Sequence, residues 1–266
     1  MFLLPYRKLG KSRLAICLLG IGTTWFGRPW PPENHSYSYP SSEEIDNYLH
    51  EIFVKIKETK ALLMIDTAAA YGQSEKIIGE YFRKNKKLLS KTFIATKWGE
   101  EFDITKHLST LSHSKEHLLA SVKRSLSCLG KIDLFYIHKA SRDVLLNHDV
   151  ITEMKQLKTR HFGDIRYIGA SFSNECALEE AIKENLIGWA DVIQVPACIF
   201  LKRPDLIHVI REKGINIVLN SVVRRGDNLP PKELYSALLQ HDEISVILTG
   251  TRHHLTETIG YFSKSK

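Results

Sequence analysis

Three short apolar runs, each closed by a residue capable of acid–base chemistry, constrain this chain more than any other feature. Leu62–Ile65 is followed at once by Asp66, and the runs Phe93–Lys97 and Leu134–His138 end in a lysine and a histidine. Short apolar runs with polar boundaries are typical of fully buried parallel strands. Chemistry in strand–helix barrels collects at the carboxyl ends of such strands. The sequence therefore predicts one rim that carries all three polar side chains.

Tyr71 follows Asp66 by five residues, in a loop that also contains Gly72. Taken alone, an acid at a strand end is often a helix cap, and a tyrosine is often part of the core. Together with Lys97 and His138, however, the set supplies a carboxylate, a phenol, an amine and an imidazole. The alternative is a structural Asp66–Lys97 ion pair beneath a packed tyrosine.

The rest of the chain alternates strand-like and helix-like segments, and the count predicts an α/β fold, a closed (β/α)8 TIM barrel. A β-hairpin is expected over 6–18, before the barrel, because Gly10–Arg13 is rich in turn residues. One domain over 1–266 is expected, since no linker interrupts the pattern. The other strands are expected at 18–22, 164–171, 191–195, 215–219 and 245–248. Helices are expected from Ser41 or Ser42, at 74–84, from Ser114, and at 142–158, 175–185, 204–213 and 230–240, with the last helix opening at 249–252.

Composition excludes several classes of function. The formal charge is +7 over 266 residues, but lysines and arginines are scattered, so no nucleic-acid surface is expected. No apolar run is long enough to span a membrane, and no membrane partner is expected. The four cysteines, at 17, 128, 176 and 198, have neither disulfide nor metal spacing and are expected to be reduced thiols in the cytoplasm. No metal site is expected.

The residues at the predicted rim resemble the signature of the aldo-keto reductases. The resemblance extends from Tyr6 to Glu257, and its motifs are Asp66-Thr67-Ala68, Tyr71-Gly72, Ser74-Glu75, Gly79, Thr96-Lys97 and Ile137-His138. It implies an NADP-dependent oxidoreductase that reduces an aldehyde or ketone to an alcohol. Because no side chain donates hydride, a nicotinamide is needed in any case.

The catalytic roles follow from the residue types and match those that the resemblance implies. Tyr71 would donate the proton, and an ammonium group on Lys97 would favour loss of that proton. Asp66 would hold Lys97 charged and oriented. His138 would hydrogen-bond either the substrate oxygen or Tyr71 and help to polarise the carbonyl group.

The start of the last helix is expected to bind phosphate. Gly250, Thr251 and Arg252 would present free backbone N–H groups there, and the Arg252 fork suits a 2′-phosphate, which favours NADP over NAD. The resemblance adds further cofactor contacts and completes the expected set: Thr23, Asp66, Ser171, Gln194, Asn220, Ser221, Val222, Arg225, Gly250, Thr251, Arg252, Glu257 and Thr258.

This sequence departs from the family pattern at several of these places. Phe172 and Thr258 stand where the family commonly has asparagine, and Asn220 stands where an aromatic residue or arginine is common. The segment after Gly226 and the C-terminal region are short, so the site is expected to be open, or completed by the 28–42 loop or a partner.

The substrate pocket is expected to include Trp25, Trp30 and Trp98. The loop 28–42 contains prolines, serines and tyrosines, and it would either line that pocket or simply pack on the surface. Two other functions remain open: a nucleotide-binding regulatory or partner subunit on the same barrel, and a lyase or isomerase without net redox chemistry. The carbonyl substrate and the oligomeric state are not predicted.

Overall fold

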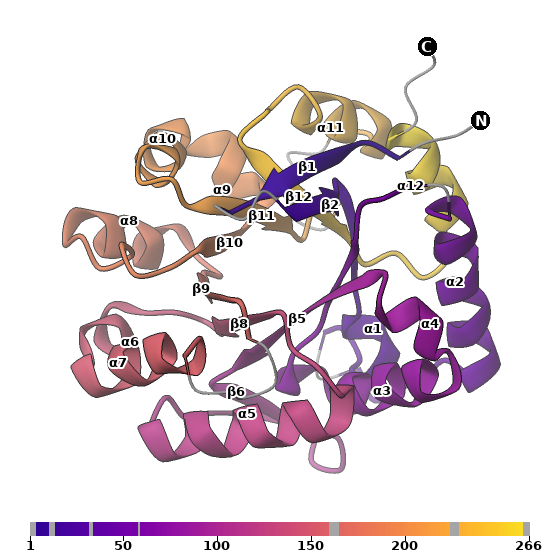
Figure 1. The fold of residues 1–266 in the computed structure, drawn as a ribbon, viewed down its shortest axis with the longest axis horizontal. Coiled ribbons are helices and arrows are strands. Elements are labelled where there is room, and N and C mark those ends of the chain that lie inside the picture. Colours follow the sequence, from indigo (N-terminus) through magenta and orange to yellow (C-terminus); the bar gives the residue numbers. More distant parts are fainter. Residues whose placement is uncertain are drawn as a thin grey trace.

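A computed structural model describes residues 4–10, 14–31, 34–57, 59–159, 165–223 and 229–262. Eight parallel strands close into a barrel in the order β3-β4-β5-β8-β9-β10-β11-β12 (Figure 1). The barrel strands are β3 (Leu19–Gly22), β4 (Leu63–Asp66), β5 (Thr92–Trp98), β8 (Leu134–Ile137), β9 (Tyr167–Ser171), β10 (Val192–Pro196), β11 (Asn216–Asn220) and β12 (Ile244–Thr249). The expected (β/α)8 barrel is confirmed.

Helices surround the barrel on its outer side (Figure 1). They are α1 (Thr24–Gly27), α2 (Ser42–Lys55), α3 (Ser74–Lys84), α4 (Lys86–Leu89), α5 (Lys115–Leu129), α6 (Arg142–Leu146), α7 (His148–Leu157), α8 (Glu175–Lys183), α9 (Ala197–Lys202), α10 (Pro204–Glu212), α11 (Pro231–Leu238) and α12 (Leu255–Phe262), with a 3-10 turn, η1, at Ala69–Tyr71. A large apolar core fills the space between strands and helices.

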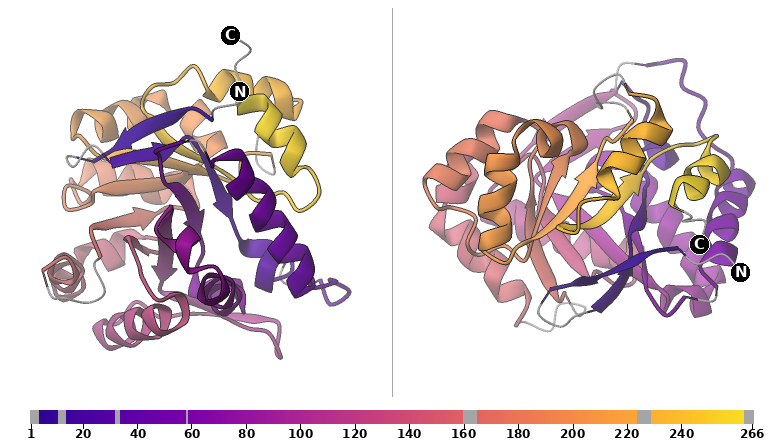
Figure 2. Two further views of the ribbon diagram at one scale, coloured as in Figure 1. Left: turned by 45° about the vertical axis from the view of Figure 1, so that its right-hand side comes forward. Right: turned by 90° about the horizontal axis from the view of Figure 1, so that it is seen from above.

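The predicted N-terminal hairpin closes one end of the barrel. Strands β1 (Tyr6–Leu9) and β2 (Leu14–Cys17) pair antiparallel and lie across the barrel end in all three views (Figures 1 and 2). Leu9 and Ile16 are fully buried in the cluster that fills the barrel interior. Tyr167, at the beginning of β9, belongs to the same cluster, so the hairpin covers the amino-terminal ends of the strands.

Side-chain caps explain where several helices begin. Ser41 accepts a hydrogen bond from the backbone N–H of Glu44, and Ser114 accepts one from His117; both were expected helix starts. The helix predicted over 142–158 is instead two helices. Asn147 is extended and caps α7 through its side chain, so it ends α6 and turns the chain.

Several short elements were not predicted, among them a two-stranded sheet and a helix. Strands β6 (Glu100–Asp103) and β7 (Leu108–Leu111) form a two-stranded antiparallel sheet directly after β5, and α9 precedes α10. Both are short insertions on the barrel. The expected fifth strand began at residue 164, which lies outside the described residues, and β9 begins at Tyr167.

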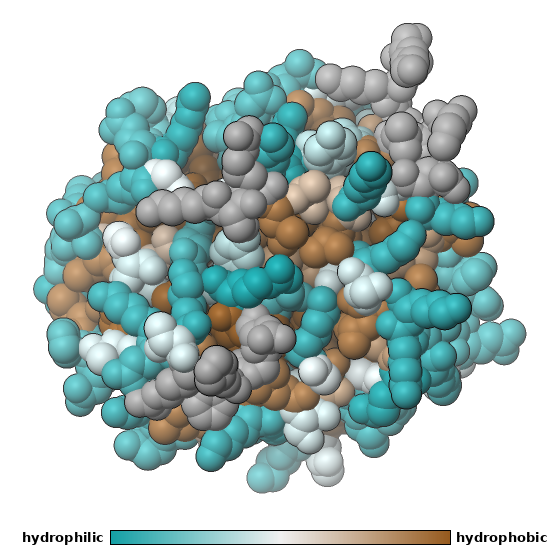
Figure 3. Space-filling model, viewed as in Figure 1, coloured by the Kyte–Doolittle hydropathy of each residue, from teal (hydrophilic) through white to brown (hydrophobic). Residues whose placement is uncertain are grey.

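The face that carries the hairpin has hydrophilic and hydrophobic side chains interspersed (Figure 3). Tyr6, on β1, is one of the exposed aromatic residues. Among the described residues, no helix combines the length and the apolar character that crossing a membrane requires.

Candidate active site

The alternation of side chains along the strands places six polar residues at one rim. Positions that differ by two share a face of a strand. In β4, Met64 faces the barrel interior, and Asp66, two residues later, lies on the same face. In β8, Leu134 and Tyr136 face the interior, and His138 follows two residues after Tyr136. Six polar residues each follow an interior-facing residue of their strand by two positions: Asp66, Lys97, His138, Ser171, Gln194 and Asn220. The sequence therefore folds with apolar layers below and a polar layer at the carboxyl ends.

Lys97 connects the strand-end acid to the tyrosine. Its ammonium group donates to Asp66 Oδ1 at 2.5 Å and to the Thr67 carbonyl at 2.9 Å, and it lies 3.5 Å from Tyr71 Oη. Asp66 and Lys97 are almost wholly buried. Tyr71, the last residue of η1, extends over this pair. The structure thus brings together the three residues as the sequence predicted.

The buried ion pair keeps Lys97 charged. Burial raises the pKa of Asp66, although the Lys97 ammonium and the Gln194 amide oppose that rise. Burial alone would lower the pKa of Lys97, but the Asp66 carboxylate and Tyr71 raise it above its ordinary value. A positive charge is therefore held beside the phenol of Tyr71.

His138 completes the four-residue set as a neutral imidazole. Its ring meets the Tyr71 ring edge to face, with 6.1 Å between the ring centroids. Burial, and then the positive charge of Lys97, lower the pKa of His138 to about 3. The backbone carbonyl of His138 contacts His113 Nε2 at 2.8 Å, which fixes the chain where it leaves β8.

An amide network joins three more of the predicted residues to Asp66. Gln194 donates to Asp66 Oδ2 at 2.9 Å, and its carbonyl oxygen accepts from Ser171 and Asn220 at 2.9 and 3.0 Å. Gln194 is completely buried. In this structure Gln194 and Ser171 therefore support the floor of the site from below, while Asn220 reaches its surface.

A cluster that was not predicted lies beside His138. Glu100, at the start of β6, is 1% exposed. Its carboxylate lies 3.0 Å from Lys139 Nζ, 3.3 Å from Arg28 Nη1 and 3.4 Å from His138 Nδ1. Burial would raise the pKa of Glu100, but His138, Lys139 and the Ser109 hydroxyl lower it below its ordinary value.

Arg28 links this cluster to the turn that carries Tyr71. It donates to the Ala70 carbonyl at 2.9 Å and to Ser109 Oγ at 2.9 Å, and its guanidinium lies over the Phe102 ring. A carboxylate two residues after a strand that carries a lysine was the available signal for Glu100. Its pairing with an arginine 72 positions away could not be read from the sequence.

A cavity of about 830 Å³ opens above the Asp66–Tyr71 pair. Its volume lies in the range of ligand sites, roughly 300–1,000 Å³. Many of the predicted site residues line it: Trp25, Trp30, Asp66, Tyr71, Asn220, Ser221, Val222, Gly250, Thr251, Arg252, Glu257 and Thr258. Arg28 and Tyr37 of the 28–42 loop also lie on its wall, and residues there that were not predicted include Gly22, Thr24, Tyr235, His254 and Tyr261.

Thr23 and Trp98 do not lie where the sequence placed them. Thr23 is fully buried; its hydroxyl donates to the Asp66 carbonyl and accepts from Ser74, so the neighbours Gly22 and Thr24 face the cavity instead. Trp98 is fully buried and packs against the His113 ring. It is not among the cavity-lining residues because it continues β5 on the face opposite to Lys97.

The predicted phosphate-binding end of the cavity is partly occupied by an internal ion pair. Helix α12 begins at Leu255, three residues later than expected. Arg252 forms a two-point contact with Glu44 at 2.6 and 2.7 Å and donates to the Ser38 carbonyl at 2.7 Å. Thr251 Oγ1 accepts from the backbone N–H of His254. Arg225 lies outside the described residues.

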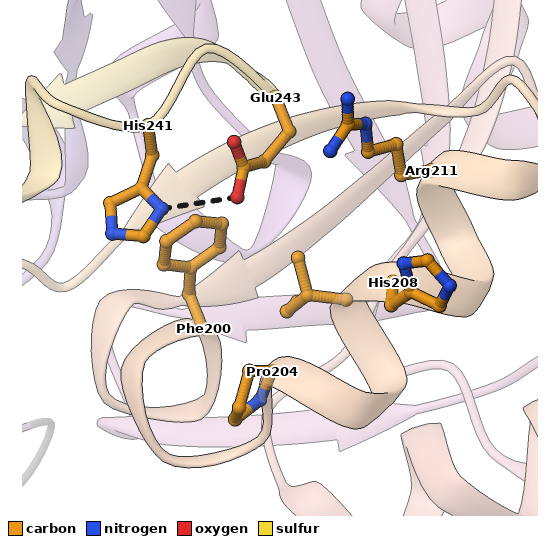
Figure 4. A pocket seen from close by; sticks show the side chains of 7 residues that line it. Phe200, Pro204, His208, Arg211, His241 and Glu243 are labelled. Atoms are coloured by element: carbon orange, nitrogen blue, oxygen red, sulfur yellow. Dashed lines mark hydrogen bonds and ion pairs between the residues drawn. The ribbon is translucent and has the colours of Figure 1, made fainter.

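A second, smaller cavity of about 160 Å³ lies on the outer side of the barrel and contains none of the predicted residues. Phe200 of α9, His208 and Arg211 of α10, and His241 and Glu243 before β12 surround it (Figure 4). Within the described ranges, no group of three or more histidine, cysteine or acidic side chains could hold a metal ion.

Comparisons with known proteins show the family of the chain. The model of the aldo/keto reductase family matches residues 18–229. Aldo-keto reductase str7 of Strobilurus tenacellus is 27% identical over 230 residues, which are 84% of this chain and 62% of that protein. The chain therefore spans less than two thirds of that relative's length.

Two solved structures illustrate the likeness in fold. A Pseudomonas aeruginosa protein described as an aldo-keto reductase superposes with a TM-score of 0.77 at 25% identity, over 97% of this chain and 93% of that one. An aldo-keto reductase from Klebsiella pneumoniae, solved in complex with NADPH, has a TM-score of 0.64 at 13% identity, over 97% and 90% of the two chains.

Proposed function

The chain belongs to the aldo/keto reductase family, and on that premise we propose that it reduces an aldehyde or ketone to an alcohol with NADPH as the reductant. The observation that carries this proposal is the contact of one buried lysine, Lys97, with both Asp66 and Tyr71. An ion pair of purely structural purpose would not require a phenol at its exposed end. Here Tyr71 lies on the wall of the large cavity.

The residues around the cavity fit a nicotinamide cofactor. Its volume of about 830 Å³ accommodates an extended dinucleotide with a small substrate. Asn220 Oδ1 is buried in the wall and has no hydrogen-bond partner among the described residues, which suits an amide N–H. The next residue, Ser221, has a φ of 52°, in the left-handed region, and such backbone conformations cluster at binding sites.

When bound, the reduced nicotinamide would supply the hydride. Tyr71 would donate a proton to the carbonyl oxygen, and the charge on Lys97 would stabilise the phenolate left behind. Asp66, held by Gln194, keeps that charge in place. His138, whose ring meets that of Tyr71 edge to face, would hydrogen-bond the substrate or Tyr71. Trp25 and Trp30 on the cavity wall favour an apolar or aromatic substrate.

The preference for NADPH over NADH rests on Arg252. It lies on the cavity wall before α12, and a guanidinium is well suited to a 2′-phosphate. The four cysteines are free thiols, which supports a reducing compartment such as the cytoplasm.

Two measurements test the proposal. The first is a titration with NADPH and with NADH, followed by quenching of tryptophan fluorescence, because Trp25 and Trp30 line the cavity. The second is a screen of aldehydes and ketones for consumption of NADPH. Binding without consumption would favour a regulatory subunit. Conversion of substrate without consumption would favour a lyase or isomerase.

Tyr71→Phe tests the proton donor. We expect kcat to fall by about 100-fold or more, with the NADPH dissociation constant unchanged, because only the hydroxyl is removed. Tyr261→Phe is the matched control, since Tyr261 also lines the cavity but lies far along the chain, in α12. A Tyr71→Phe variant that turns over at the parent rate would show that another group donates the proton.

A further inference from the structure

Glu100 is a fully buried carboxylate at the catalytic end that the proposed chemistry leaves unused. It is 1% exposed and follows the catalytic lysine by three residues. A buried carboxylate requires partners, and Glu100 has two cationic ones, Lys139 and Arg28. Its third neighbour is the imidazole of His138. Glu100 therefore has more neighbours of this kind than a single ion pair would need.

The contact with His138 determines where a neutral imidazole carries its proton. Nδ1 lies 3.4 Å from Glu100 Oε2 and has no hydrogen-bond partner in the described part of the chain. If Nδ1 were unprotonated, its lone pair would face a carboxylate oxygen in a buried setting, which is repulsive. With the proton on Nδ1, the N–H group lies 3.4 Å from the negative charge, and this proximity is favourable even though the contact lacks hydrogen-bond geometry.

A doubly protonated ring is disfavoured by the surroundings. Besides Glu100, the charged groups that act on His138 are Lys97 of β5, Lys139 next to it in sequence and Arg28 from the segment after α1. Burial disfavours the charged ring, and even with Asp66 paired to Lys97 the three cations outnumber the two carboxylates around it. The imidazole is therefore neutral, and only one of its nitrogens can carry a proton.

We propose that Glu100 is a positioning residue that holds the neutral His138 ring with its proton on Nδ1, which leaves Nε2 able to accept but not to donate a hydrogen bond. This inference deepens the proposed reductase function and rests on it for its kinetic consequence. Nδ1 is buried, and the exposed 13% of the His138 side chain belongs to its other atoms. The exposed part of the ring therefore lies away from Nδ1, and it is the part that a substrate in the site would meet.

The consequence is that Tyr71 and His138 take different hydrogen-bonding roles toward the substrate. Tyr71 alone would donate to the carbonyl oxygen, and His138 Nε2 would accept from a hydroxyl group. A carbonyl compound with a hydroxyl on the adjacent carbon supplies both groups at once. The substrate class that this site selects is therefore an α-hydroxy aldehyde or ketone.

The direct test reads the ring nitrogens themselves. In protein labelled with nitrogen-15, long-range proton–nitrogen correlation spectra distinguish a protonated from an unprotonated ring nitrogen. The His138 signals are assigned by their loss in His138→Gln. We expect Nδ1 protonated and Nε2 bare in the parent protein at neutral pH. A proton on Nε2 would overturn the proposal, and this readout does not depend on any reductase activity.

Glu100→Gln tests the cause. The amide can donate to Nδ1, so a substantial share of the proton should move to Nε2 in this variant. Glu101→Gln is the matched control, because Glu101 is the adjacent acid on β6 but pairs with His117 and Arg124 away from His138. If folded Glu100→Gln keeps the parent tautomer, Glu100 does not set it.

A kinetic comparison tests the consequence, with 2-hydroxyacetophenone and acetophenone as probes. The ratio of their kcat/KM values should fall by about tenfold in Glu100→Gln, which corresponds to the loss of one hydrogen bond to the hydroxyl. Glu101→Gln should keep the parent ratio. Comparing ratios cancels the intrinsic reactivity of the two ketones. An unchanged ratio in Glu100→Gln would overturn the assigned substrate class, whereas failure of the parent to reduce any carbonyl compound would count against the proposed function and leave the spectroscopic result standing.

Discussion

Burial and neighbouring charges shift the pKa values of several residues of the site, and His138 is the residue whose shift bears on stability near neutral pH. Its pKa in the folded protein is about 3, against about 6.5 in an unfolded chain. Between these two values the unfolded state binds a proton that the folded state does not. The stability contributed by the neutral ring is therefore fully present above the unfolded value and is lost as the pH falls toward 3.

This difference in pKa predicts that the free energy of unfolding falls measurably as the solution becomes acidic. The free energy of unfolding should decline by up to about 1.4 kcal/mol for each pH unit below about 6.5 on account of His138 alone. Urea unfolding of the parent and of His138→Gln at several pH values measures the effect. As the pH falls, the free energy of unfolding of the parent should decrease relative to that of His138→Gln. Parallel curves would mean that the folded state also protonates His138 near its ordinary pKa.

At this scale, the carboxyl ends of the apolar runs predicted three polar residues of the rim. Asp66, Lys97 and His138 each end an apolar run, so a local pattern was sufficient to place them. Glu100 and Arg28 were missed because their pairing depends on two insertions, and no periodicity indicates how insertions pack. Thr23 and Trp98 were misplaced because an error of one residue at a strand end reverses the face of a side chain.

Helix packing offers a prediction at the scale of elements. Helices α3 and α5 lie in close contact at Gly79, where an added Cβ would lie 1.8 Å from the Cys128 carbonyl oxygen. Gly79→Ala should therefore lower the free energy of unfolding by about 2–3 kcal/mol, because the two backbones must separate. Thermal or urea unfolding measures this loss.

Gly260→Ala is the control for helix propensity. Gly260 lies within α12, and an added Cβ would meet nothing within 4 Å. Alanine should stabilise that helix by about 1 kcal/mol. If Gly79→Ala were also neutral or stabilising, the close approach of α3 and α5 would not be a constraint in solution.

The order of the barrel strands and helices could be predicted from the sequence, whereas breaks within helices and inserted strands could not. All eight barrel strands were expected, because each is an apolar run of ordinary strand length. The break between α6 and α7 was not, since the 142–158 segment keeps a helical apolar pattern through Asn147, and only the cap geometry of that residue ends the first helix. The β6–β7 pair contains no strong turn signal between its strands.

At the scale of the whole molecule, the two ends of the barrel sequence meet beside the cavity. Helices α2 and α12 lie side by side (Figure 1), and Glu44 at the start of α2 binds Arg252, 208 positions later. Nearby, Glu51 of α2 accepts a hydrogen bond from Thr256 of α12 at 2.5 Å. The segment around Ser38 is joined to the same guanidinium, so the loop after α1 is fastened over this end of the cavity.

This arrangement makes the cofactor preference depend on an exchange of anions. A 2′-phosphate would have to replace the Glu44 carboxylate at Arg252 or bind beside it against like-charge repulsion. Arg252→Ala should therefore weaken NADPH binding and barely affect NADH. Glu44→Gln should strengthen NADPH binding relative to NADH by about tenfold, equivalent to about 1.4 kcal/mol, because the guanidinium is then free of its internal anion.

Fluorescence titrations of the variants with both cofactors measure these changes. Glu51→Gln is the matched control, because it alters an acid on the same face of α2 and loosens a contact with α12 without changing the charge beside Arg252. Its ratio of NADPH to NADH affinity should equal that of the parent. Equal effects of Glu44→Gln on the two cofactors would show that the Glu44–Arg252 pair only joins the two helices, and Arg252 would then not support the proposed preference for NADPH.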